Sequence, residues 1–103
     1  MVLTMSKEDL IYNYSDPEKV EKRAKLFFKD DFELDISTRK DKKYMIRGDF
    51  TNGKWVHFGA WGMEDFTKHK DNERKKAFQK RNHKWRLMPE NSAAFISYYL
   101  LWT

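Results

Sequence analysis

The stretch YMIRGDFTNGKWVHFGA, residues 44–60, predicts the β-hairpin around which the fold of this chain is built. It places the dipeptide Asn52-Gly53 between two runs that are rich in β-branched and aromatic residues. Asn-Gly is the strongest short hairpin signal, because a two-residue type I′ turn needs positive φ at both central positions. We therefore predict two antiparallel strands, 44–50 and 54–60, joined at this dipeptide.

A third strand is predicted directly before the hairpin. In FELDIS, residues 32–37, apolar residues alternate with acidic ones, which is the pattern of a strand with one buried face. The polar run RKDKK, residues 39–43, separates this strand from the hairpin and predicts a turn. The expected sheet has three antiparallel strands.

A helix is predicted before the sheet, at residues 15–29. Ser15 and Glu18 have the spacing of a capping box, and Pro17 falls in the first turn, where no backbone hydrogen bond is lost. One apolar stripe follows the helical period at Val20, Ala24, Phe27 and Phe28. This stripe predicts an amphipathic helix that packs against the sheet.

Two more helices are predicted after the sheet. The first is basic and spans about 71–85, and Pro89 disfavours helix at the residue before it. The second, within 92–102, has Asn91 or Ser92 as its N-cap and is apolar on most sides. Such a helix lies either at the centre of the core or in a subunit interface.

Composition indicates one small α+β domain. The chain has 103 residues, of which 17% are aromatic and 36% charged. We predict a single domain at 15–103, preceded by an N-terminal arm at 1–14 that packs across the domain or onto a neighbour. The absence of cysteine excludes disulfides, thiolate zinc sites and cysteine nucleophiles. No run reaches the roughly 18 apolar residues of a membrane span, so we expect no membrane partner.

Positive charge is concentrated in two segments. Residues 68–86 hold nine Lys/Arg against two Asp/Glu, and residues 37–50 hold five against two. Residues 1–36 are acidic, with six against nine. This asymmetry can steer a polyanion to one face or pair subunits head to tail.

The basic helix has one narrow apolar stripe, formed by Phe78 and Trp85. Acidic residues are nearly absent from its remaining surface, so the i, i+4 pairing of an ordinary solvated helix is missing. We predict contact with nucleic acid, DNA in the first instance, or with another polyanion, with little sequence selectivity. A solvated surface tuned for solubility is the alternative. The predicted contact residues are Arg39, Lys40, Lys42, Lys43, Lys68, Lys70, Arg74, Lys75, Lys76, Lys80, Arg81, Lys84 and Arg86.

A second hypothesis is a structural or interaction protein that forms a homodimer through its apolar C-terminal helix. Burial on most sides of that helix would then be completed by a second copy. The predicted interface residues are Phe95, Tyr98, Tyr99, Leu101 and Trp102.

A third hypothesis is a small metal-dependent nuclease built from His57, Glu64, Asp65 and His69. The spacing of these residues matches no zinc or HNH-nuclease pattern. A histidine on a strand face is more often structural, and carboxylates before a helix stabilise its N-terminal dipole. We therefore predict a protein that is not an enzyme, with no catalytic residue, metal or cofactor.

Four aromatic residues near the end of the hairpin admit two interpretations. As in single-strand binders, they could stack nucleic-acid bases. A domain of this size also needs large side chains in its core, and core packing is the favoured interpretation. The residues are Trp55, Phe58, Trp61 and Phe66.

The second half of the chain, from Tyr44 onward, resembles an uncharacterised small-domain family that is frequent in giant nucleocytoplasmic large DNA viruses. The shared pattern consists of His57-Phe58-Gly59, Gly62, Glu64-Asp65-Phe66-Thr67, His69-Lys70-Asp71, Arg74-Lys75, Arg81 and Leu100-Leu101-Trp102. Phe78 departs from it where the family often has Tyr, and Tyr98-Tyr99 replaces a more Trp-rich pattern.

The resemblance transfers no established activity. It implies a viral protein located in the virion or in the host cytoplasm or nucleus. In that setting it implies a role in virion DNA packaging or in host-factor recruitment.

Overall fold

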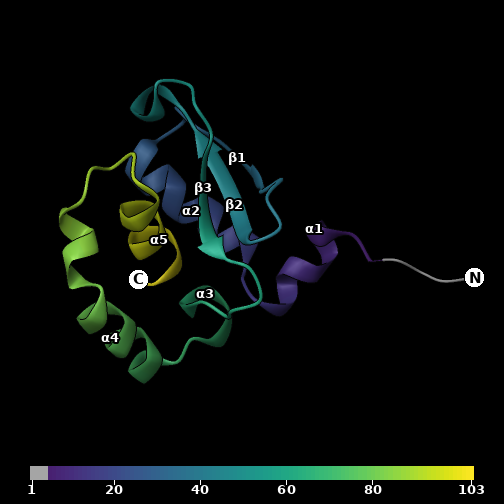
Figure 1. Ribbon diagram of the computed structural model, residues 1–103, viewed down its shortest axis with the longest axis vertical. Helices are drawn as coiled ribbons and strands as arrows, with labels where there is room; N and C mark the ends of the chain where they lie inside the picture. The colour runs from purple at the N-terminus through teal and green to yellow at the C-terminus, as the bar shows by residue number, and fades with distance from the viewer. Residues whose placement is uncertain (1–4) are drawn as a thin grey trace, which may run out of the picture.

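The computed structural model describes residues 5–103 and contains the predicted sheet. The strands β1 (Glu33–Ile36), β2 (Lys42–Arg47) and β3 (Val56–Ala60) pair antiparallel in that order (Figure 1). Helices precede and follow the sheet, so the predicted α+β fold class is confirmed.

The register of the sheet places its largest apolar residues side by side. Tyr44 lies opposite Phe58, and Ile46 lies opposite both Leu34 and Val56. Tyr44, Ile46 and Phe58 are all at most 1% exposed. Because side chains of a strand alternate between its faces, this row defines the face that meets the core.

The turn between β2 and β3 is longer than the predicted two-residue turn. It contains a 3-10 helix, η2 (Asp49–Thr51), followed by Asn52 and Gly53 with φ of 55° and 74°. The Thr51 hydroxyl group donates to the carbonyl of Gly48 and accepts from its N–H, both at 3.0 Å. These bonds end β2 early, so the positive φ values were predicted correctly and the strand ends were not.

The first long helix, α2 (Pro17–Phe28), begins at a different cap from the one predicted. The side chain of Asp16 accepts a hydrogen bond from Lys19 N at 3.4 Å. Ser15 is buried, and its hydroxyl oxygen lies 3.1 Å from that of Thr67. The predicted capping box is therefore wrong, because the Ser15 side chain is held inside the domain.

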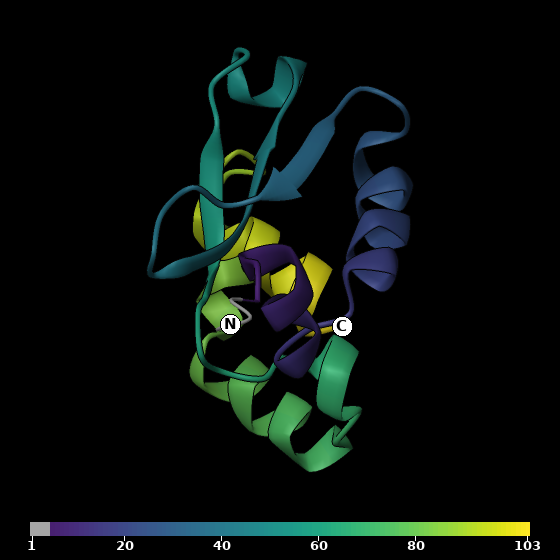
Figure 2. The same ribbon diagram turned by 90° about the vertical axis from the view of Figure 1, so that its right-hand side faces the viewer.

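The core lies between α2, the sheet and the last helix, α5 (Ala93–Leu101). α5 contacts both α2 and β3 and lies at the centre of the molecule (Figure 2). The buried core residues are Ile11, Val20, Ala24, Phe28, Tyr44, Ile46, Phe58, Ile96, Leu100 and Leu101. Phe27, which was predicted on the buried stripe of α2, is 44% exposed.

The N-terminal segment packs on its own domain. It forms α1 (Lys7–Leu10) and the 3-10 helix η1 (Ile11–Asn13), and Ile11 is fully buried in the core. The predicted arm at 1–14 thus contributes to the core, except that residues 1–4 lie outside the described part of the chain.

Residues 66–87 form an outer arc around α5 (Figure 1). It consists of α3 (Phe66–His69), α4 (Asn72–Arg81) and the 3-10 helix η3 (His83–Leu87). The predicted single helix at 71–85 is thus divided at Asn82. None of the helices in residues 5–103 is long and apolar enough to cross a membrane.

Candidate nucleic-acid interface

Helix α4 is attached to the domain by a column of aromatic rings. Phe78 stacks on Trp102 with ring centroids 4.2 Å apart, and Trp85 meets Phe78 at 5.6 Å and 83°. The Gln79 amide group adds a hydrogen bond of 2.8 Å to the carbonyl of Trp102. The prediction that Phe78 and Trp85 hold the basic helix is confirmed, and the rest of its surface remains open.

Capping sets where α4 begins. The Asp71 carboxylate accepts hydrogen bonds from the backbone N–H groups of Glu73 and Arg74, at 3.0 and 3.2 Å. An acidic cap offsets the positive end of the helix dipole, which lets the helix carry cations along its length.

Most cations of this region are free of acidic partners. Seven exposed ones form no ion pair with an acidic side chain of residues 5–103. These residues are Lys68, Lys70, Lys76, Lys80, Arg81, Lys84 and Arg86. We call them the arc cations. A surface of this kind has charge that no neighbouring carboxylate neutralises.

Two further cations of α4 are partly engaged. Arg74 lies 3.6 Å from the Glu64 carboxylate in a half-exposed ion pair. The ammonium group of Lys75 lies 4.4 Å from the centroid of the Phe66 ring. Both side chains keep hydrogen-bond donors that an anion can use.

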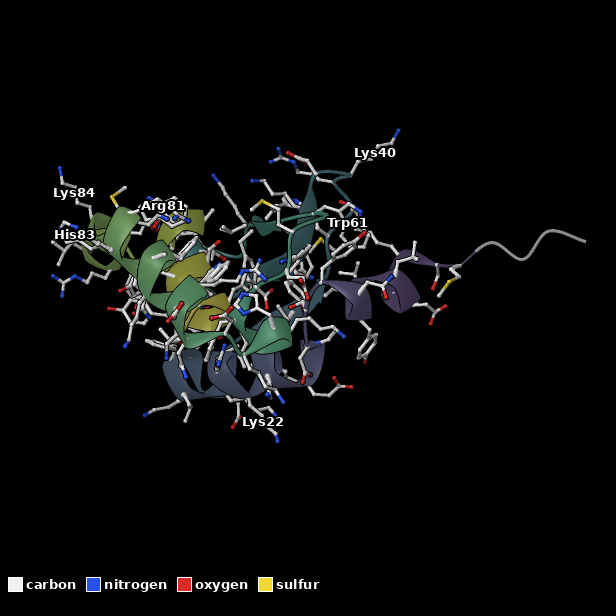
Figure 3. The ribbon with its side chains drawn as sticks, turned by 90° about the horizontal axis from the view of Figure 1, so that it is seen from below. Lys22, Lys40, Trp61, Arg81, His83 and Lys84 are labelled. Carbon is white, nitrogen blue, oxygen red and sulfur yellow. The ribbon has the colours of Figure 1, made fainter. Side chains whose placement is uncertain are left out.

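The hairpin between β1 and β2 supplies the second cationic group. Lys40 is exposed at the turn, Arg39 pairs with Asp41 at 3.2 Å, and Lys42 is half-buried at the start of β2. In Figure 3, Lys40, Arg81 and Lys84 all lie in the upper half of the view, with Lys40 at the right and the other two at the left, and Lys22 of α2 lies at the bottom.

Lys43 does not belong to this surface, which corrects the prediction. Its side chain is 2% exposed, and its ammonium group lies 3.1 Å from the equally buried carboxylate of Asp65. The Asp65 carboxylate also accepts from Thr67 N at 3.0 Å and caps α3. Burial lowers the pKa of Lys43, and the charge of Asp65 opposes this decrease. Lys43 therefore holds β2 to α3 and contacts no external anion.

The predicted dimer-interface residues also include both buried and partly exposed side chains. Tyr98 and Leu101 are 8% and 1% exposed and lie in the core of the single chain, so they are not available to a second copy. Trp102 is half-buried under Phe78. The apolar helix therefore lies in the core of the single chain, and the homodimer stays a prediction. The other two predicted interface residues, Phe95 and Tyr99, are half-exposed at the edge of the core.

A pocket of about 610 Å³ lies between the arc and the rest of the domain. Lys42 lines it from the sheet, and Arg74 and Arg81 line it from α4. The other lining residues are Lys43, Phe58, Gly59, Ala60, Met63, Glu64, Ala77, Phe78, Asn82, Trp85, Ala93, Ala94, Ser97, Leu101 and Trp102. The two cationic segments thus meet at opposite sides of one mostly apolar hollow.

The residues of the nuclease hypothesis are engaged in other contacts and are not arranged to hold a metal within residues 5–103. The Nδ1 atom of His57 lies 2.7 Å from the Ser37 hydroxyl oxygen, and Nδ1 of His69 accepts from Asp71 N at 2.9 Å. Glu64 and Asp65 are paired with different cations. Within residues 5–103 there is no group of three or more His, Asp or Glu side chains arranged to hold a metal.

One residue that the sequence did not single out is Lys7. Its ammonium group donates to the carbonyls of Ser37, Arg39 and Lys42 at 2.7, 2.6 and 2.7 Å. It also lies 5.0 Å from the Trp61 ring. Burial lowers the pKa of Lys7. Lys7 therefore fixes the N-terminal segment to the hairpin that carries Lys40, and no sequence motif indicates such a contact.

A buried polar network was also missed. The Tyr44 hydroxyl group donates to Ser15 at 2.7 Å, and Thr67 accepts from Asp16 N at 2.9 Å. Burial raises the pKa of Tyr44. The network joins the start of α2 to β2 and α3, and its members are too far apart in sequence for spacing to reveal them.

Residues 32–82 match the model of a family of unknown function, DUF5754. The DUF5754 match extends from just before β1 to just after α4, so it includes the sheet and the basic helix and leaves α5 outside. It supports the predicted kinship with an uncharacterised domain family, and the viral origin stays a prediction. No curated protein and no solved structure matches the chain.

Proposed function

We propose that this protein is a non-enzymatic nucleic-acid-binding protein with little sequence selectivity. The observation that carries the proposal is the set of arc cations, which are exposed and have no acidic partner within residues 5–103. A polyanion that contacts them releases its condensed counterions, and this release provides affinity without reading sequence.

The position of the hairpin supports the same function. Lys40 lies in the same half of the view as Arg81 and Lys84 and away from Lys22 (Figure 3), which fits a bound polyanion long enough to reach from the arc to the hairpin. Lys7 holds the hairpin turn through three carbonyl groups, which keeps this second contact in a fixed place. A rigid arrangement loses less conformational entropy on binding.

The experiment compares two charge reversals that change net charge equally. Lys80→Glu with Lys84→Glu alters the arc, and Lys22→Glu with Lys25→Glu alters α2 on the opposite side. Binding of a fluorescently labelled 20-nucleotide DNA is measured by anisotropy across a salt series. We expect the arc variant to weaken binding at least about tenfold and to flatten the salt dependence, whereas the α2 variant changes it about twofold or less.

Two results would reject the proposal. The first is an absence of binding by the unmodified protein at low salt. The second is an equal loss in both variants, since this would mean that only net charge matters and that the arc is not the contact surface.

A homodimer is the second candidate function, and one observation favours it. Leu26 is 81% exposed and Phe27 44%, and the Phe27 ring lies 5.1 Å from Tyr99 and 6.1 Å from Phe95. This apolar patch on α2 and α5 could be covered by a second copy. Light scattering across a range of concentrations tests this, and Leu26→Glu should dissociate the dimer. A monomer at all concentrations would exclude it.

The cellular setting follows only from the resemblance to viral proteins. We propose that the protein acts in the virion or in the host cytoplasm or nucleus, in DNA packaging or host-factor recruitment. Detection of the protein in purified particles would test the first location.

A further inference from the structure

The pocket beside α4 has the size and lining of a binding site. Its volume of about 610 Å³ falls within the roughly 300–1,000 Å³ range of small-molecule sites. Small residues contribute to its lining, namely Ala77 of α4 and Ala93 and Ala94 of α5. At Gly59, an added Cβ would lie 2.9 Å from a methyl carbon of Leu101, so the wall there has no room for a larger residue.

Aromatic side chains in the lining of the pocket are suited to stacking. Trp85 and Trp102 both line it, and both are half-buried. Phe78 covers Trp102 face to face, whereas it meets Trp85 at 83°. No other aromatic contact of Trp85 occurs among the described residues, so its indole ring is not stacked face to face on another ring.

Polar groups in the pocket can contact the edge of a planar ligand. The amide nitrogen of Asn82 donates to the Phe78 carbonyl at 3.1 Å, which directs its oxygen elsewhere as an acceptor. The Ser97 hydroxyl group also lines the pocket and can both donate and accept. Hydrogen bonds of this kind orient a ligand that stacking alone would leave free to rotate.

Cations and one carboxylate, Glu64 paired with Arg74, line the pocket, and this charge indicates the class of ligand. Arg81 and Arg74 line the pocket on α4, and Lys42 lines it on the sheet, while the arc cations continue beyond it to Lys84. A ligand that matches this surface has a flat apolar group next to a chain of negative charges. Single-stranded nucleic acid has both, because its bases are unpaired and its phosphates are regularly spaced.

We infer that the pocket receives an unpaired base of single-stranded nucleic acid while the arc cations hold the phosphates on either side. The inference rests on the proposed function and specifies its ligand. A duplex cannot use the pocket, since its bases are stacked and paired inside the helix. The pocket should therefore add affinity for single strands and none for duplexes.

The test measures binding of a single-stranded 20-nucleotide DNA, the same sequence as RNA, and its DNA duplex, all at one salt concentration. We expect either or both single strands to bind at least about fivefold more tightly than the duplex, since only they can stack a base in the pocket. Intrinsic tryptophan fluorescence should be quenched by the single strand and not by the duplex.

Two matched substitutions locate the effect. Trp85→Leu removes the stacking surface, and Trp55→Leu alters a tryptophan outside the pocket, which lies beneath Arg47 at 4.4 Å. We expect the first to abolish both the quenching and the preference for single strands, and the second to abolish neither. Should Trp85→Leu fail to fold, Ala94→Leu fills the pocket and should have the same effect.

The outcomes separate the inference from the proposed function. Equal affinity for single strands and duplex, with salt-sensitive binding of both, overturns the inference and leaves the proposed function standing. Absence of binding to all three overturns both. A poly-glutamate peptide of matched charge that binds as tightly as the single strands, with the same loss in Trp85→Leu, would assign the pocket to an acidic protein partner and overturn the inference.

Discussion

Two groups of lysines in this molecule have opposite surroundings. Lys43 and Lys7 direct their ammonium groups inward, one to the buried Asp65 carboxylate at 3.1 Å and the other to three backbone carbonyls. Lys80 and Lys84 of the arc are exposed and pair with no acidic group of residues 5–103. The same side chain therefore stabilises the fold in one region and remains available to a ligand in the other.

Charge counts along the sequence therefore do not locate a binding surface. The segment 39–43 appears in the sequence as one cationic cluster, yet Lys40 is exposed and Lys43 is buried. Substitution of an inward cation should lower folding stability and leave DNA binding unchanged. Substitution of an exposed cation should weaken DNA binding and leave folding stability unchanged. Substitutions at inward and outward cations test that distinction directly.

The largest effect is expected at the buried ion pair. Lys43→Met leaves the Asp65 carboxylate buried without its countercharge, and loss of one partner of such a pair costs about 3–5 kcal/mol. Urea unfolding measures this loss, with Lys80→Met as the exposed control, expected within about 0.5 kcal/mol of the unmodified protein. Duplex DNA binding by folded Lys43→Met should be unchanged. If Lys43→Met kept its stability but bound DNA more weakly, the assignment of Lys43 to the fold would be contradicted.

A smaller loss of folding stability is expected when Gly59 of β3 is replaced. Gly59 has φ of 80°, and an added Cβ would lie 2.9 Å from Leu101. Gly62 has φ of 89° with nothing within 4 Å of its Cβ position, so it serves as the control for backbone strain alone. We expect Gly62→Ala to lose about 1 kcal/mol and Gly59→Ala about 1–2 kcal/mol more, by urea unfolding. Equal losses would show that the close contact with Leu101 has no energetic effect.

Removal of the Lys7 ammonium group should have a moderate effect. Lys7→Met leaves the three hairpin carbonyls without this donor, and we expect a loss of about 1–2 kcal/mol because the site is partly exposed. Lys40→Met, on the same hairpin, should leave stability within about 0.5 kcal/mol and weaken DNA binding instead. Thermal unfolding and anisotropy on both variants check this. A Lys7 variant of unchanged stability would mean that these contacts do not hold the N-terminal segment.

The smallest effect is expected from pH. Burial and the nearby cations Arg39 and Lys7 lower the pKa of His57, and burial and Arg74 lower the pKa of His69, each from its ordinary value of 6.5. A pKa lowered in the folded state means that the unfolded chain binds the proton more tightly. Stability should therefore be fully present above pH 6.5 and fall as pH decreases through the folded-state values.

Nearby acidic groups limit this effect. Asp41 opposes the shift of His57, and Glu64, Asp71 and Asp65 oppose that of His69. We expect a small decrease in Tm between pH 7.5 and 5.5, and a smaller one when both histidines are replaced by glutamine. An increase in Tm on acidification would contradict the direction of both shifts.

The sheet and the aromatic attachment of α4 could be predicted because their signals are local. Strand alternation, the Asn52-Gly53 positions and the spacing of Phe78 and Trp85 depend only on neighbours in the chain. The cap of α2 was misassigned because Ser15 bonds to Thr67, a residue far away in sequence.

The candidate site was predicted in part for the same reason. The cations of α4 are recognisable from their density, whereas the burial of Lys43 depends on β2 lying beside the loop that carries Asp65. The pocket could not be predicted, because its walls come from the sheet, α4 and α5 and meet only in the fold.

The most direct test of nucleic-acid binding at the arc is a two-dimensional ¹H–¹⁵N NMR titration of the protein with a single-stranded oligonucleotide. We predict that the largest shift changes occur at α4, η3, the pocket walls and the turn around Lys40. The amides of α2 near Lys22, on the opposite side, should not change. Shift changes centred on α2, or on the apolar patch of Phe27 and Phe95, would contradict it.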